Sequence, residues 1–201
     1  MFAIIQNGAV SRVIQPNVAF VVQGKQYLAN FISTSTPEER QAEGIYEIVE
    51  GEQKDQRFYW VSGPNYTVDE QTKTVLASYT ATAKLLEDRE EVDENGDPMW
   101  VKVLGEVNGE PAMVDSEERL VTKGLKSQWT AQVKTTAGSL LAATDWMVIR
   151  KAERNIDVPA ETQTYRAAVV AECDRLETAI AGAASVEALI AVVNAQNWPK
   201  A

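Results

Sequence analysis

The sequence contains no histidine and only one cysteine, Cys173, among its 201 residues. The missing histidine excludes Ser-His-Asp and Cys-His catalytic arrangements, zincin motifs and most zinc sites. A single thiol excludes a disulfide within the chain, and its place on the apolar face of an expected helix indicates a buried structural residue. A glycine-rich phosphate loop is also missing. We therefore predict that the protein is not an enzyme and has no catalytic residues, cofactor or metal.

The sequence also lacks long apolar runs, and none approaches the roughly 20 residues of a membrane-spanning helix. The N-terminal segment 1–12 has no basic region before its apolar residues, so we expect neither secretion by the usual signal nor membrane insertion. Basic residues are scarce in the first half, because residues 1–115 hold nine Lys or Arg against 19 Asp or Glu, whereas residues 116–201 hold ten of each. This asymmetry predicts a two-part chain and argues against sequence-independent nucleic-acid binding.

The first part has the pattern of β-hairpins. Asn-Gly dipeptides at 7–8, 95–96 and 108–109 favour tight primed turns between short apolar-rich segments. Thr36 and Glu39 form a capping box for a short helix that Gly44 would end, and Gly63-Pro64 is expected to break a strand over 57–61. Residues 1–115 are thus predicted to form a β-rich domain, in which 86–115 form a small meander or a projecting hairpin.

The second part, 116–201, is predicted to be α-helical. Ser116 is a candidate N-cap of the first long helix. Because Gly124 weakens the helix locally, the helix begins either at Ser116 or near Leu125. Asp145 is expected to cap a short helix over 146–149 within a connector, and Pro159 to start a second long helix. A third, short helix follows Ser185. The fold class is therefore α+β, with a β-hairpin-rich region followed by an α-helical hairpin and a third short helix.

Other binding chemistries are weaker interpretations. Asp93, Asn95 and Asp97 alternate as in a calcium-binding loop. Pro98, however, takes the glycine position of an EF-hand loop and Leu104 its twelfth position, which favours a solvated acidic turn. The basic residues near Arg150 are flanked by acids, which favours local ion pairs over phosphate binding. Four aromatic residues are candidates for a sugar-binding surface, although their alternation favours sheet packing: Tyr59, Trp60, Tyr66 and Tyr79.

Several segments resemble tail-fibre assembly-like proteins of bacteriophages. In the helical part these are Gly124-Leu125-Lys126, Ser139-Leu140-Leu141, Thr144-Asp145-Trp146, Ile149-Arg150-Lys151-Ala152-Glu153, Pro159 and Thr164-Tyr165-Arg166-Ala167-Ala168-Val169. The front half is similar to the same proteins at Met1–Gly8, at Ser35–Glu39, and at Phe58–Val61 followed by Tyr66–Val68. The resemblance covers most of the chain, and residues 86–118 match least.

The resemblance implies a non-enzymatic structural role in a phage tail, as a tail fibre or a fibre-to-baseplate adaptor. The alternatives are a fibre-assembly chaperone that binds transiently and a carbohydrate- or receptor-binding tail protein. The implied partners are other tail-fibre or baseplate proteins and further copies of the chain, a trimer by analogy, and the implied location is the virion after assembly in the host cytoplasm. The residues expected to form structural or interaction sites are Trp129, Leu140, Leu141, Asp145, Trp146, Arg150, Tyr165 and Arg166.

Overall fold

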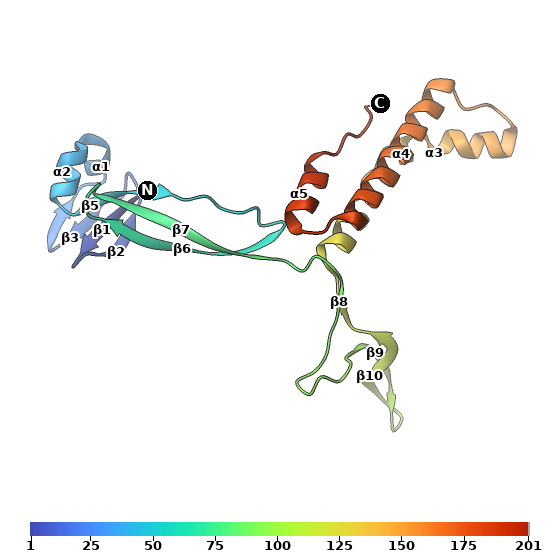
Figure 1. The fold of residues 1–201 in the computed structure, drawn as a ribbon, viewed down its shortest axis with the longest axis horizontal. Helices are drawn as coiled ribbons and strands as arrows, with labels where there is room; N and C mark the ends of the chain where they lie inside the picture. The colour runs from blue at the N-terminus through green and yellow to red at the C-terminus, as the bar shows by residue number, and fades with distance from the viewer. Residues whose placement is uncertain (201) are drawn as a thin grey trace. The chain divides into compact units, whose positions relative to one another are not determined.

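The computed structural model describes residues 1–200, and the chain divides into two compact units, Met1–Thr82 and Ala83–Ala201. Strands account for 34% of the residues and helices for 36%, and the strands come first, which confirms the predicted α+β class. The elements are labelled in Figure 1. The division falls after Thr82, whereas the change in composition falls at residue 115. The expected projecting hairpin therefore shares a unit with the helices.

The first unit is built on a five-stranded sheet in the order β2-β1-β5-β7-β6. Its strands are β1 (Phe2–Gln6), β2 (Ala9–Ile14), β5 (Ile45–Glu50), β6 (Tyr59–Asp69) and β7 (Thr74–Ala83). Strand β1 is buried on both faces: Ile4 joins one apolar cluster, and Ala3 and Ile5 join another with β5 and β7. A strand that is apolar at successive positions, as β1 is, fits this placement inside the sheet.

A small hairpin and two short helices cover one side of this core. They are β3 (Phe20–Val22), β4 (Lys25–Tyr27), α1 (Phe31–Thr34) and α2 (Pro37–Ala42). The predicted capping box is confirmed, because Thr36 Oγ1 accepts from the Glu39 backbone N–H at 3.2 Å and Glu39 Oε2 accepts from the Thr36 N–H at 2.8 Å. Gly44 ends the helix with a φ of 68°, as expected.

The predicted break at Gly63-Pro64 is wrong, because β6 continues through both residues. Strand β6 lies at the edge of the sheet, where a backbone N–H facing outward has no ladder partner to lose. A proline is compatible with such an edge strand, and the position of a strand in its sheet cannot be predicted from Gly-Pro alone.

The second unit contains a β-hairpin, a short two-stranded ladder and three helices. They are β8 (Arg89–Glu90), β9 (Trp100–Val107), β10 (Glu110–Arg119), β11 (Val121–Thr122), α3 (Leu125–Arg154), α4 (Ala160–Gly182) and α5 (Val186–Asn194). The hairpin β9–β10 turns at Asn108-Gly109, which confirms the predicted hairpin. The helices share an apolar core of Leu125, Val133, Ala137, Val169, Cys173, Leu176, Ile180, Val186, Leu189 and Val193.

Helix α3 begins at Leu125, the second of the two predicted starts, and Ser116 lies inside β10 instead of capping a helix. The first backbone N–H groups of α3 are satisfied by the segment before the hairpin. Gly124 N donates to Asp88 Oδ1 at 2.8 Å and Leu125 N donates to the carbonyl of Leu85 at 2.8 Å. An acidic group at this end also suits the helix dipole. Leu85 and Asp88 therefore supply the cap that the sequence around Gly124 lacks.

Candidate functional site

The predicted connector at residues 144–153 is wrong, because α3 runs through it without a break. No glycine or proline interrupts 139–154, and the helix ends at Asn155, which has a left-handed φ of 54°. The true connector is therefore the segment 155–159. Lys151 Nζ donates to Asn155 Oδ1 at 2.9 Å and to Asp157 Oδ1 at 2.5 Å, and this bond holds the pKa of Asp157 below its ordinary value.

Arg166 of α4 contacts the stretch of α3 where the motif residues lie. Its Nη1 donates to the Leu141 carbonyl at 3.0 Å and to Thr144 Oγ1 at 2.6 Å, and it forms an ion pair with Asp145 at 2.9 Å. The neighbouring Tyr165 places its hydroxyl 3.5 Å from the Leu140 carbonyl, a long contact. The structure thus brings together five of the eight predicted residues: Leu140, Leu141, Asp145, Tyr165 and Arg166.

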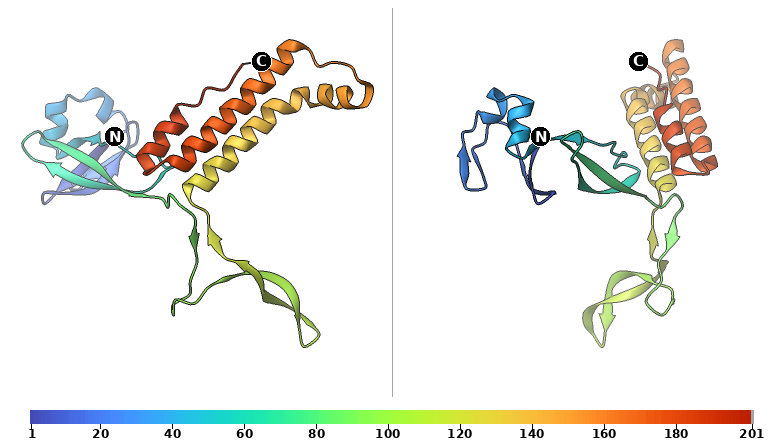
Figure 2. Two further views of the ribbon diagram at one scale, coloured as in Figure 1. Left: turned by 45° about the vertical axis from the view of Figure 1, so that its right-hand side comes forward. Right: turned by 60° about the vertical axis from the view of Figure 1, so that its left-hand side comes forward.

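These contacts have a local effect on α3. The Leu141 carbonyl accepts from Arg166 and also from Thr144 Oγ1, at 2.9 Å. Side chains that bond to carbonyls within a helix bend it. Figure 2 shows α3 changing direction toward its C-terminal end. The Thr-Asp and Tyr-Arg motifs therefore act together to fix the direction of the last turns of α3.

The last turns of α3 expose apolar side chains. The buried residues of α3 are Leu125, Val133 and Ala137, so none follows residue 137. Trp146 is 52% exposed and Ile149 56%, and Ile156 in the connector is 45% exposed. We call these three residues the α3-end patch. A contiguous exposed apolar patch marks a contact with another protein chain, and this group of side chains is our candidate for one.

Arg150 contributes to this patch through its contact with Trp146. The guanidinium carbon lies 4.8 Å from the centre of the Trp146 ring, a cation–π arrangement between successive helical turns. Arg150 Nε is buried, and within residues 1–200 it has no hydrogen-bond partner. The guanidinium of Arg150 therefore packs against the ring of Trp146. Trp129, the remaining predicted residue, is partly buried near the start of α3, outside this cluster.

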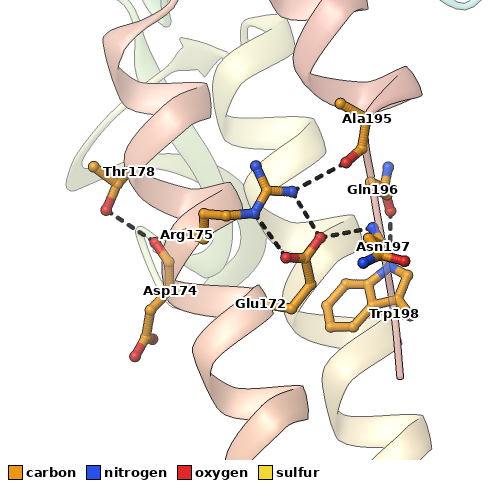
Figure 3. A network of polar contacts seen from close by, with 8 residues as sticks. All are labelled: Glu172, Asp174, Arg175, Thr178, Ala195, Gln196, Asn197 and Trp198. Carbon is orange, nitrogen blue, oxygen red and sulfur yellow. Dashed lines mark hydrogen bonds and ion pairs between the residues drawn. The ribbon is translucent and has the colours of Figure 1, made fainter. Parts of the chain in front are cut away.

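A pocket of about 500 Å³ adjoins the Arg166 cluster. Its lining consists of Leu140, Ala143, Thr144, Glu161, Thr162, Tyr165 and Lys200. The C-terminal tail that brings Lys200 there is fixed to α4 by the network of Figure 3, in which Glu172 Oε1 accepts from the Asn197 N–H at 2.7 Å and Arg175 Nη2 donates to the Ala195 carbonyl at 3.1 Å. The ion pair with Arg175 lowers the pKa of Glu172. The pocket can take an apolar side chain with a polar end.

The four aromatic residues considered for sugar binding do not form one surface. Tyr59 is buried at 8% exposure, whereas the adjacent Trp60 is 68% exposed on the opposite face of β6. Tyr66 packs against the second apolar cluster of the first unit, and the Tyr79 hydroxyl donates to Glu50 Oε2 at 2.7 Å. The placements of Tyr59 and Tyr66 agree with sheet packing, whereas Trp60 is exposed. Ile149 and Ile156 were not among the predicted site residues, although the sequence has apolar residues at Trp146, Val148, Ile149 and Ile156.

Within residues 1–200, no group of three or more acidic or thiol side chains is arranged to hold a metal ion. None of the described helices combines the length and apolarity needed to span a membrane. No family model, curated protein or solved structure matches the chain.

Proposed function

We propose that this protein is a non-enzymatic structural component of a bacteriophage tail, either a tail fibre or a fibre-to-baseplate adaptor, that acts through contacts with other protein chains. The observation that supports it is the α3-end patch, Trp146, Ile149 and Ile156, held in a fixed direction by Arg166. Two of the segments that carry the phage resemblance, Thr144–Trp146 and Ile149–Glu153, lie in and beside this patch. Its partners are other tail-fibre or baseplate proteins, without nucleic acid or membrane insertion, and its location is the virion after assembly in the host cytoplasm.

The exposed area of the chain also supports a role in protein contacts. The accessible surface is 13244 Å². Dividing the mass of 22.1 kDa by length gives units of about 9 and 13 kDa, and two separate compact domains of these masses expose roughly 11,000 Å² in total. The surplus of roughly 2,000 Å² belongs to the two units taken separately, and a standard interface covers about 800 Å² per partner. The units therefore expose more surface than compact domains of their mass, which favours contacts with other protein surfaces.

A fibre-assembly chaperone is the second candidate, because it would use the same patch transiently. Mass spectrometry of purified virions separates the two. A structural component is present in the particle in a fixed ratio to the fibre protein. A chaperone is missing from the particle but binds unassembled fibre chains, and a protein found in neither place would refute both functions.

The patch is tested directly by co-purification with the neighbouring fibre protein. We expect Ile149→Ser combined with Trp146→Ser to lose this binding. The control is Val170→Ser in α4, which changes a residue that is 46% exposed outside the patch. Equal loss in the control, or no loss in the patch variant, would contradict the assignment of the patch.

A further inference from the structure

The hairpin β9–β10 has one open edge. Val107 and Glu110 flank the two-residue turn, so they form a hydrogen-bonded pair. From this pair onward, hydrogen-bonded and non-hydrogen-bonded pairs alternate along the hairpin. Leu104 opposite Met113 and Lys102 opposite Asp115 are consequently non-hydrogen-bonded pairs. Their N–H and C=O groups therefore point away from the partner strand. On β9 the outward groups belong to Lys102, Leu104 and Glu106, and within residues 1–200 no backbone bond outside the strand ladder reaches them.

The two edges of this hairpin are not equivalent. Pro111 pairs with Glu106, a non-hydrogen-bonded position, so its nitrogen faces the outer edge of β10 and has no N–H to donate. A proline at an edge blocks the addition of another strand. Strand β9 carries no proline, and its outer edge is the one that can accept a further strand.

The side chains of β9 are also uncovered. On one face Leu104 is 76% exposed and its cross-strand neighbour Met113 is 61% exposed. On the other face Val103 is 42% and Val107 50% exposed. A two-stranded hairpin is at best marginally stable in water, whereas a sheet of three or more strands with an apolar face is stable. An additional pair of strands would supply that sheet.

We propose that β9 pairs antiparallel with β9 of a second copy of this chain, about a two-fold axis at Leu104. In this register Lys102 faces Glu106 of the second copy and Glu106 faces Lys102 of the second copy. Leu104 faces itself, and Val101 faces Val107 of the second copy. The three outward-facing positions form three hydrogen-bonded pairs, and the result is a four-stranded sheet whose other face carries the valines.

Charge selects this register over the alternatives. Parallel pairing in register places Lys102 against Lys102 and Glu106 against Glu106, and like charges directly opposite each other are destabilising. Moving the axis to Lys102 or to Glu106 creates the same repulsion at the centre. Lys102 already forms an ion pair with Asp115 of its own chain at 2.5 Å, so in the dimer it lies between two carboxylates. The contact has two-fold symmetry. The proposal does not depend on whether the protein belongs to a phage tail.

Charge reversal on the full-length chain tests this proposal by light scattering across a concentration series. We expect the wild type to dimerise, and Lys102→Glu or Glu106→Lys alone to weaken the dimer about tenfold or more, because each variant replaces two attractive contacts with two repulsive ones. An equimolar mixture of the two variants restores opposite charges at both contacts and should dimerise. A variant that had merely lost the hairpin would not be rescued by mixing.

Asp115→Lys is the matched control, because it removes the ion pair of Lys102 within the chain but leaves both contacts of the second copy. We expect it to dimerise like the wild type. A wild type that is monomeric at every concentration, or an oligomer whose mass is unchanged in both charge variants, would overturn the proposal. A mixture of the variants that stays monomeric would do so as well. Absence of the chain from virions would refute the role as a structural component of the tail and leave this dimer untouched.

Discussion

Replacing Arg166 with methionine should loosen the end of α3 while leaving the helical core in place. Methionine keeps much of the side-chain volume but removes the charge and the donors. The substitution removes the bonds from Arg166 to the Leu141 carbonyl, to Thr144 Oγ1 and to Asp145. All three acceptors lie in one turn of α3, so the effect is concentrated on the last turns of that helix.

The size of the effect follows from the exposure of each partner. The Arg166 side chain is 21% exposed, and hydrogen bonds from a charged donor contribute about 1.5–3 kcal/mol each. The Asp145 side chain is 53% exposed, and an ion pair of that kind contributes about 0.2–1 kcal/mol. The Leu141 carbonyl keeps its bond from Thr144, so its loss is partial. We expect a net destabilisation of about 2 kcal/mol.

Urea denaturation followed by tryptophan fluorescence measures this change, because Trp129 and Trp146 both lie in α3. Hydrogen exchange should show faster exchange over residues 141–154 in the variant and little change over 125–137. The control is Arg154→Met, an exposed arginine in the last turn of the same helix. If both variants lose the same small amount, the contacts of Arg166 do not hold α3 and the reasoning fails.

Four further predictions concern the second unit. Leu176→Ala should cost about 3 kcal/mol of unfolding free energy in urea, because Leu176 is fully buried, whereas a loss under 1 kcal/mol would mean that the core is loosely packed. Gly124→Ala should destabilise the protein by about 1–3 kcal/mol, because an added Cβ would lie 2.3 Å from the Glu87 carbonyl. Gly138→Ala should stabilise it slightly, because the space around Gly138 is open. Equal effects of the two substitutions would contradict the close contact at Gly124. Asp88→Asn should destabilise the protein at pH 7 but not near pH 2, because bonds from Lys123, Ser127 and Gly124 lower the pKa of Asp88 from 3.8 to about 2. The contribution of Asp88 to stability is therefore complete above about pH 4 and disappears as the pH falls toward 2. A difference in stability that persists at pH 2 would refute this prediction. Cys173 should react slowly with a thiol reagent until urea unfolds the chain, because burial raises its pKa, and rapid labelling of the folded protein would contradict that burial.

Local signals in the sequence predicted the elements that are stabilised locally. The Asn-Gly turns at 7–8 and 108–109 and the capping box of Thr36 depend on residues at most three positions apart, and the structure has all of them. A turn that needs positive φ angles is specified by its own residues. The hairpins and the α+β class could therefore be predicted without any knowledge of packing.

The wrong N-cap predictions concern helix starts that depend on contacts between residues far apart in the sequence. Asp145 was read as the cap of a new helix, but its carboxylate pairs with Arg166 of α4 and the helix continues. Ser116 was read as another cap, yet the start of α3 is capped by Asp88, which is far away in the sequence. An N-cap signal depends on which donor the side chain meets, and only the fold decides that. The same fact explains why Tyr165 and Arg166 could be named as site residues while their contacts with carbonyls could not be predicted.

In the second unit, the residues that stabilise the fold differ from the residues that we propose to contact other chains. The core side chains of α3 end at Ala137, and the α3-end patch lies beyond them. Strand β9 contributes no buried side chain, and its most exposed apolar residue, Leu104, lies at the centre of the proposed two-fold contact. Changes at these positions should therefore remove contacts between chains at little cost to folding, whereas loss of Leu176 should do the reverse. If Leu104→Ala unfolded the second unit as strongly as Leu176→Ala, β9 would be part of the core and the separation would be wrong.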